Sequence, residues 1–232
     1  MNTRTLDLSL YFCTDREMTE KNGGNFLQNL TSAILGGVTC VQLREKKLSS
    51  REFFRIGQVV QPLTQKYGIP LIINDRADVA LALNADGVHV GQEDLPCNVL
   101  RKVMGADKII GVSVSNADEA VKAERDGATY LGVGAMMATA TKKDAEVVTV
   151  EVLRDICQNV NIPVVAIGGI NINTISRLQG SGIDGVAVVS ALAAVKDPQT
   201  AASEIKEKFG KNLANEGEKQ REAKDSPNRC RQ

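Results

Sequence analysis

Residues 71–96 read LIINDRADVALALNADGVHVGQEDLP, and this stretch decides the fold. Short apolar runs at residues 71–73 and 87–90 predict consecutive buried parallel strands with a helix between them. Asp75 follows the first of these strands, and Asp94 follows the second. Ligands bind at the carboxyl ends of parallel strands in α/β folds, so both carboxylates are expected at one ligand-binding edge.

The same strand-and-helix unit repeats along the chain. Apolar residues at helical spacing, capping residues such as Ser49 with Glu52, and glycines separate further strands. Those strands are predicted at residues 8–12, 40–43, 109–113, 130–133, 164–167 and 185–189. Eight evenly spaced units are typical of a closed barrel, because open doubly wound sheets usually have fewer. The sequence therefore predicts a single TIM (β/α)8 barrel over residues 1–210.

The last part of the chain, residues 211–232, differs in composition from the rest. It reads KNLANEGEKQREAKDSPNRCRQ and is almost free of apolar side chains, while the last barrel helix is expected at 197–209. A segment that buries so little surface does not offset the entropy cost of ordering. The sequence therefore predicts a disordered polar tail or linker after the barrel.

Composition and charge exclude several classes of partner. The 232 residues are 43% hydrophobic but only 3% aromatic, so the core is built from Val, Ile, Leu and Ala, which suits buried parallel strands. The 28 Lys and Arg residues balance 28 Asp and Glu residues, which indicates neither a nucleic-acid nor a membrane partner. A homo-oligomer is compatible with these features.

The cysteines and the N-terminus bear on location. The chain has an odd number of cysteines without metal-ligand spacing, namely Cys13, Cys40, Cys97, Cys157 and Cys230. Cys13, Cys40 and Cys157 lie in apolar segments and are interpreted as small core residues. The N-terminus has too short an apolar run for a signal peptide, and no segment is of membrane-spanning length. We therefore expect a reducing compartment, the cytoplasm.

Residues that follow the predicted strands form a chemically coherent set on the rim of the barrel. They are cations, carboxylates, amides, hydroxyls and glycines: Gln42, Arg44, Lys46, Asn74, Asp75, Asp94, Ser113, Thr139, Thr141, Lys142, Lys143, Gly168, Gly169 and Ser190.

Each group on the rim has a structural and a functional interpretation. Asp75 and Asp94 could each cap the next helix, but together at adjacent strand ends they favour Mg²⁺. Arg44 and Lys46 could be solvated charges. However, a metal-bound polyanion needs cations on its other side, which favours a diphosphate clamp.

The glycines after the seventh strand, the single histidine and two methionines also have structural and functional interpretations. Gly168 and Gly169 could form an ordinary turn, but their place after the seventh strand, with Ser190 after the eighth, favours a phosphate site. His89 is the only histidine and lies within a strand, so it is interpreted as a hydrogen-bonded core residue rather than a catalyst. Met136 and Met137 are interpreted as apolar packing.

Seven ordered motifs resemble those of the thiamine-phosphate synthase (thiamine-phosphate pyrophosphorylase) family. The resemblance covers about residues 8–208. The motifs read QLREK (42–46), NDRADVA (74–80), DGVHVGQEDLP (86–96), IIGVS (109–113), TATKKDA (139–145), VAIGGI (165–170) and VAVVSA (186–191).

The resemblance implies a TIM barrel that joins hydroxymethylpyrimidine diphosphate to hydroxyethylthiazole phosphate. Diphosphate departs to leave a pyrimidine-methyl cation, which the thiazole nitrogen captures to form thiamine phosphate. By the same resemblance, Asp75 and Asp94 bind Mg²⁺, and Arg44, Lys46, Ser113 and Lys142 are catalytic. The implied substrate contacts are Gln42, Arg44, Glu45, Lys46, Asn74, Ser113, Thr139, Thr141, Lys142, Gly169, Val189 and Ser190.

One segment departs from the family pattern. The loop after the sixth strand usually has the form Gly-Pro-x-aromatic-Pro-Thr-x-Thr-Lys, whereas here Ala135 and Ala138 replace the prolines and Met137 the aromatic residue. Loss of proline loosens an unbound loop, so loop closure and thiazole affinity are expected to be affected. The reaction class is not expected to change, because Thr139, Thr141 and Lys142 remain.

Three rivals stay open on the sequence alone. A thiazole tautomerase relative shares the barrel but needs an acid-base histidine on the rim. A phosphosugar epimerase or isomerase has no need for Mg²⁺ with a diphosphate clamp. The third rival is a non-catalytic binder of thiazole phosphate or thiamine phosphate.

Overall fold

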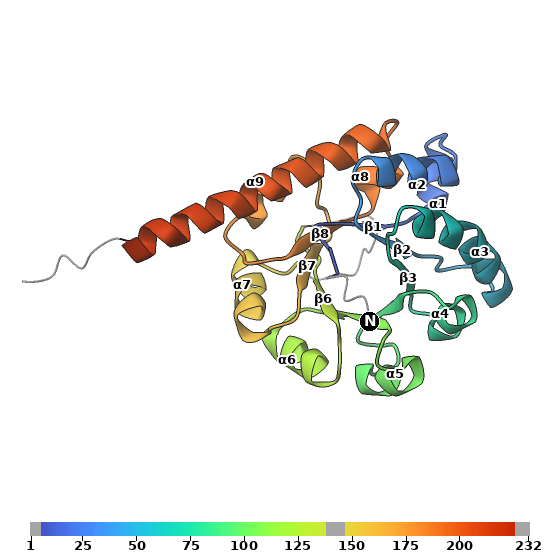
Figure 1. Cartoon of the computed structure of the whole chain (residues 1–232), viewed down its shortest axis with the longest axis horizontal. Coiled ribbons are helices and arrows are strands. Elements are labelled where there is room, and N and C mark those ends of the chain that lie inside the picture. The colour runs from blue at the N-terminus through green and yellow to red at the C-terminus, as the bar shows by residue number, and fades with distance from the viewer. Residues whose placement is uncertain (1–5, 138–146, 226–232) are drawn as a thin grey trace, which may run out of the picture.

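A closed barrel of parallel strands forms the centre of the molecule (Figure 1). The computed structural model describes residues 6–137 and 147–225, with the backbone alone for 212–225. Adjacent strands pair in chain order, and Leu10 lies opposite Val186 where the first strand meets the last. The strands are β1 (Leu10–Cys13), β2 (Cys40–Leu43), β3 (Leu71–Asn74), β4 (Gly87–Val90), β5 (Ile109–Val114), β6 (Tyr130–Val133), β7 (Val164–Ile167) and β8 (Gly185–Val188). The predicted TIM barrel is confirmed.

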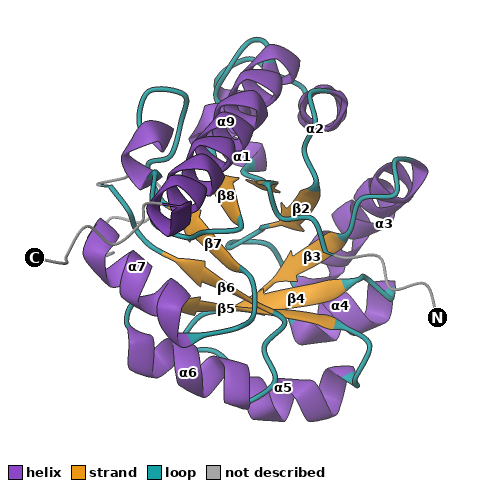
Figure 2. Cartoon of the chain, turned by 60° about the vertical axis from the view of Figure 1, so that its left-hand side comes forward, coloured by secondary structure: helices purple, strands orange, loops and turns teal. Residues whose placement is uncertain are grey.

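Helices surround the strands on the outside of the barrel (Figure 2). The longer ones are α2 (Phe26–Leu35), α3 (Ser50–Lys66), α4 (Ala77–Leu83), α5 (Cys97–Met104), α6 (Ala117–Arg125), α7 (Val150–Asn159) and α9 (Pro198–Asp225). Three are a single turn or little more: α1 (Arg16–Lys21), α8 (Ser190–Ala193) and the 3-10 helix η1 (Ile175–Leu178). Among the helices of the described residues, none is long and apolar enough to cross a membrane.

Side-chain caps fix where several helices begin. Ser49 accepts from the backbone N–H of Glu52, whose carboxylate accepts from the N–H of Ser49, so the predicted capping box is present. Asn116 and Thr149 cap α6 and α7 by accepting from the backbone N–H groups of Glu119 and Val152. These caps set the loops that connect strand ends to helices.

The core has two layers, because successive residues of a strand point to opposite faces of the sheet. One layer lies between strands and helices, and includes the fully buried Leu30, Phe53 and Leu153. The other fills the inside of the barrel with Leu8, Tyr11, Cys13, Cys40, Ile72, Tyr130, Val165 and Ala187. Cys13 and Cys40 are thus buried free thiols, and the partly buried Cys157 packs against the outer layer, as expected.

The structure differs from the sequence-based prediction at four elements. Neither α1 nor α8 is predicted, because six or four residues are too few to show a helical period. The helix predicted at 173–179 is the shorter η1. The last helix does not end at 209 but continues to Asp225, since residues such as Ala214 and Glu218 favour helix.

Candidate active site

The predicted residues from four neighbouring strands gather at the carboxyl end of the barrel. Gln42 lies in β2 and Asn74 ends β3, and both are buried. Ser113 lies in β5, which is separated from β3 only by β4. In a parallel barrel these strand ends share one rim, so the structure brings the predicted residues of the first half of the chain together.

Asp75 is held in an unusual backbone conformation directly after β3. Its φ is 60°, in the left-handed region that residues with a side chain rarely adopt. The N–H of Asp75 donates to the carbonyl of His89 at 2.8 Å, and its Oδ2 lies 2.5 Å from Nζ of Lys46. Such a strained residue, fixed by contacts on both sides, is typical of a functional site.

Asp94 belongs to the loop after β4 and lies beside Asp75. Its Oδ2 accepts from the N–H of Gly91 at 2.7 Å. Burial raises the pKa of Asp94 and the nearby Asp75 carboxylate raises it further, while the hydrogen bond from Gly91 lowers it. The two carboxylates therefore lie close enough for each to sense the charge of the other.

Neither carboxylate caps a helix. The residues at the N-cap positions of α4 and α5 are Arg76 and Pro96, and neither helix has a side-chain cap. The capping interpretation of Asp75 and Asp94 is therefore wrong. Asp75 and Asp94 are therefore adjacent carboxylates that cap neither α4 nor α5.

The carboxylate pair has the composition that suits Mg²⁺ rather than a fully protein-bound metal. Among residues 6–137 and 147–225 there is no group of three or more His, Cys, Asp or Glu side chains able to hold a metal ion. Mg²⁺ typically takes one or two carboxylates and completes its shell with waters and substrate phosphates. Asp75 and Asp94 fit that pattern, and a bound cation would favour the ionised form of Asp94, whose pKa is raised by burial and by the Asp75 carboxylate.

Two cations lie in the loop after β2. Lys46 is exposed and reaches Asp75. Arg44 is half-buried, and its guanidinium forms no ion pair with any residue of the described chain. A half-buried guanidinium without an acidic partner is suited to an anionic ligand.

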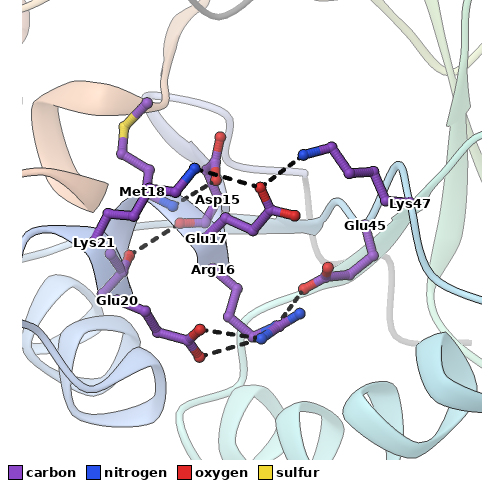
Figure 3. Close-up of polar contacts among 9 residues, drawn as sticks. Asp15, Arg16, Glu17, Met18, Glu20, Lys21, Glu45 and Lys47 are labelled. Carbon is purple, nitrogen blue, oxygen red and sulfur yellow. Dashed lines mark hydrogen bonds and ion pairs between the residues drawn. The ribbon is translucent and has the colours of Figure 1, made fainter.

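Glu45 stands between Arg44 and Lys46 in the sequence, but its side chain points to α1 (Figure 3). Its side chain is only 7% exposed, and Oε1 accepts from Nε of Arg16 at 3.1 Å. Burial raises the pKa of Glu45, whereas Arg16 lowers it. Next to this pair, Nζ of Lys47 lies 2.8 Å from Oε2 of Glu17, so α1 holds the loop at two points.

Sequence reasoning missed Arg16 and the helix that carries it. The signal available was Asp15, which accepts from the N–H of Met18 and so caps α1. The residues that follow lack an apolar period, so the sequence predicts no helix there. Arg16 stabilises the loop that bears Arg44 and Lys46 without being part of that loop.

His89 and Ser113 are hydrogen-bonded to each other inside the barrel. Nε2 of His89 lies 2.9 Å from Oγ of Ser113, and Nδ1 lies 2.8 Å from the hydroxyl of Tyr130. Burial lowers the pKa of His89 to about 4. The interpretation of His89 as a hydrogen-bonded core residue is confirmed.

The second candidate phosphate region follows β7 and β8. Gly168 and Gly169 have φ values of 98° and 69°, and a Cβ at Gly168 would lie 2.7 Å from atoms of Ala135. Val189 precedes α8 and Ser190 begins it. Met136 is buried and Met137 packs against the core, which confirms their predicted packing role. The candidate residues Thr139, Thr141, Lys142 and Lys143 lie outside the described residues.

Comparison with protein families identifies this barrel. The family model described as thiamine monophosphate synthase matches residues 10–192. The chain belongs to the thiamine monophosphate synthase family. The match includes every candidate site residue from Gln42 to Ser190, and the long helix α9 lies beyond it.

Individual members of the family are similar over most of their length. The thiamine-phosphate synthase of Clostridium tetani is 51% identical over 205 residues, which cover 88% of this chain and 97% of the relative. That of Clostridium botulinum is 52% identical over 206 residues, covering 89% and 96%. A solved structure, thiamine phosphate pyrophosphorylase from Pyrococcus furiosus, has a TM-score of 0.81 at 39% identity and covers 90% of this chain and 98% of its own.

The position where this chain departs from the usual pattern of the thiamine monophosphate synthase family is well packed. Ala135 is 6% exposed, and its carbonyl accepts from the N–H of Val148 at 2.8 Å. Its methyl group fills the space that the absent side chain of Gly168 leaves. The first replacement of proline therefore lies in a fixed part of the loop, and Ala138 lies outside the described residues.

Proposed function

We propose that this chain joins hydroxymethylpyrimidine diphosphate to hydroxyethylthiazole phosphate, and so releases diphosphate and forms thiamine phosphate. The observation that carries the proposal is the carboxylate pair Asp75 and Asp94 beside Lys46, on a barrel about half identical to thiamine-phosphate synthases. Arg44 lies in the same loop as Lys46. Opposite charges on one rim are what a bound diphosphate and its counter-ion require.

The leaving-group half of the site is assigned to the first strands. Gln42, Arg44, Lys46 and Asn74, with Lys142 from the loop after β6, would hold the pyrimidine diphosphate. Arg44 and Lys46 bind its oxygens and stabilise them more strongly as their negative charge grows, so the two cations lower the barrier to departure. Glu45, paired with Arg16, keeps the loop of these cations in place.

Asp75 and Asp94 would hold Mg²⁺ in this half of the site. When bound there, the ion supplies positive charge to the diphosphate and so favours its departure. The two carboxylates orient that charge, and Lys46 balances Asp75 before substrate arrives.

The thiazole phosphate is assigned to the opposite part of the rim. Backbone groups at Gly169 and Val189 and the hydroxyl of Ser190 would bind its phosphate, with Thr139 and Thr141 from the loop after β6. No side chain need act as a general base, because the attacking thiazole nitrogen already has a free lone pair. The site residues thus bind, orient and stabilise charge.

The tautomerase alternative is less well supported. It needs an acid-base histidine that can exchange protons with a ligand, and His89 is the only histidine in the chain. Both of its ring nitrogens are already engaged, one by Tyr130 and one by Ser113. We therefore favour coupling over proton transfer. Cys13 and Cys40, buried thiols that form no disulfide, are consistent with a cytoplasmic location, which we also propose.

A coupling assay with the full chain tests the function. Purified protein is incubated with both phosphorylated substrates and Mg²⁺, and diphosphate and thiamine phosphate are quantified. We expect equal amounts of the two products and no diphosphate when the thiazole phosphate is omitted. Thiazole isomerisation without diphosphate release would support the tautomerase alternative. Binding of thiazole phosphate or thiamine phosphate without turnover would support the non-catalytic binder.

A further inference from the structure

A row of hydrogen bonds crosses the inside of the barrel from β2 to β5. Nε2 of Gln42 lies 2.9 Å from the hydroxyl of Tyr11, which lies 2.8 Å from the hydroxyl of Tyr130. The Tyr130 hydroxyl lies 2.8 Å from Nδ1 of His89, and Nε2 of His89 lies 2.9 Å from Oγ of Ser113. Two residues assigned to substrate, Gln42 and Ser113, are therefore the two ends of one continuous chain.

Packing holds the rings of this row in place. Tyr11 and Tyr130 are 1% and 0% exposed, with ring centroids 5.8 Å apart at 73°. The rings of His89 and Tyr130 are 5.5 Å apart. Gly111 on β5 leaves the space for this contact, because a Cβ there would lie 2.4 Å from Nδ1 of His89. The rings are therefore confined to one arrangement.

The donor at one end of the row, the amide of Gln42, favours one direction of proton donation along it. The amide nitrogen of Gln42 can only donate, so Tyr11 accepts from it, and one direction of the row follows when Tyr11 gives its own proton to Tyr130. Tyr130 in turn donates to Nδ1 of His89, which then carries no proton. In this direction the imidazole proton lies on Nε2, where it is donated to Ser113.

The end of the row determines what Ser113 can do. When its Oγ accepts from His89, the hydroxyl proton of Ser113 points away from the histidine and is available to a ligand. If the hydrogen bonds of the row ran in the opposite direction, Ser113 would donate to His89 and would present only lone pairs to a ligand. The two directions thus differ in whether Ser113 offers a hydrogen-bond donor.

We propose that Tyr130 and His89 are positioning residues that hold Ser113 as a hydrogen-bond donor to the pyrimidine diphosphate. This inference rests on the proposed function for the identity of the acceptor. A donor already oriented toward the leaving group needs no rearrangement as negative charge develops, so its contribution is to kcat rather than to binding.

Nitrogen NMR tests the direction of the row without any assay of activity. His89 is the only histidine, so the full chain labelled with ¹⁵N-histidine reports on this ring alone. We expect a bare Nδ1 and a protonated Nε2 in the wild type, and a mixture of tautomers in Tyr130→Phe. The matched control Tyr67→Phe alters a tyrosine outside the row and should leave the spectrum unchanged. A proton on Nδ1 in the wild type, or rapid mixing of both forms, would overturn the proposal.

Two substitutions at His89 test the effect on turnover. The amide nitrogen of glutamine can reach the position of Nε2, whereas that of asparagine reaches only that of Nδ1. We expect His89→Asn to lower kcat about tenfold, with KM for both substrates changed less than about threefold, and His89→Gln to recover most of the loss. Equal losses in the two variants, or an unchanged kcat in His89→Asn, would contradict the assignment.

A double substitution separates positioning from general damage to the fold. If His89 acts through Ser113, His89→Asn should cause no further loss of kcat in a Ser113→Ala background. Additive losses would overturn the proposal. Failure of the wild type to release diphosphate would instead reject the proposed function, and the histidine spectrum would still decide the direction of the row.

Discussion

Nε of Arg16 donates to Oε1 of Glu45 at 3.1 Å, and this contact joins α1 to the loop that bears Arg44 and Lys46 (Figure 3). The Glu45 side chain is 7% exposed and that of Arg16 is 24% exposed. Removal of one partner of a buried pair leaves the other charge uncompensated. The contact is therefore expected to matter more than an ion pair on the surface.

Arg16→Met should lower the free energy of unfolding by about 2 to 3 kcal/mol, because it strands the buried Glu45 carboxylate. Urea unfolding followed by circular dichroism measures the change. The control is Lys47→Met, which breaks the more exposed pair with Glu17 and should hardly move the midpoint. Adding Glu45→Gln to Arg16→Met should restore part of the loss. Equal effects of Arg16→Met and Lys47→Met would show that burial of Glu45 is unimportant.

Asp94→Ala should reduce kcat by about two orders of magnitude while the fold is retained, because it removes one carboxylate of the proposed Mg²⁺ site. The Mg²⁺ concentration needed for half-maximal rate should also rise. Asp78→Ala is the matched control, since Asp78 is an exposed carboxylate paired with Arg76 on α4. Near-normal kcat in a folded Asp94→Ala variant would contradict the role of this residue.

Strand positions in this chain could be predicted from the sequence to within two residues, because each apolar run is bounded by glycine, proline or polar residues. Cys40–Leu43, Gly87–Val90, Tyr130–Val133 and Val164–Ile167 agree at both ends. Even spacing of the runs then implied closure of the barrel. Periodicity could not reveal α1 and α8, which are shorter than the window that shows a helical repeat.

The rim residues of the first half of the chain were also accessible from the sequence, because a parallel strand fixes which end its following loop occupies. The hydrogen bonds inside the barrel could not be predicted from the sequence. Tyr11 and Tyr130 are 119 residues apart, and their hydroxyls meet only because the barrel closes. A tyrosine in an apolar run looks like any other strand residue, so the partner of its hydroxyl has no local signal. The same holds for Arg16 and Glu45, which are 29 residues apart.

Stability should fall as pH rises above about 9. Burial raises the pKa of Cys13 to about 12, and it also raises the pKa values of Cys40, Tyr11 and Tyr130. At a pH between the ordinary pKa of such a group and its raised pKa in the fold, the unfolded chain releases a proton that the folded chain retains. The unfolded state then binds fewer protons, and each such group costs about 1.4 kcal/mol for every pH unit.

Urea midpoints measured from pH 8 to 11 test this alkaline loss of stability. Cys13→Ala should show a shallower decline than the wild type, because one of the buried acids is gone. A flat profile above pH 9, or identical slopes for the two proteins, would show that these groups titrate normally in the folded barrel.

Removal of residues 212–232 should leave activity and melting temperature unchanged, although α9 continues to Asp225. The buried side chains that anchor α9 come earlier, at Ala202, Ile205 and Phe209. Its first turn packs tightly on α2, where a Cβ at Gly36 would lie 2.2 Å from the carbonyl of Gln199. A longer deletion from residue 203 serves as the control and should lower the melting temperature, because it removes Ile205 and Phe209. If the shorter deletion also lowered the melting temperature or kcat, the end of α9 would contribute to the barrel.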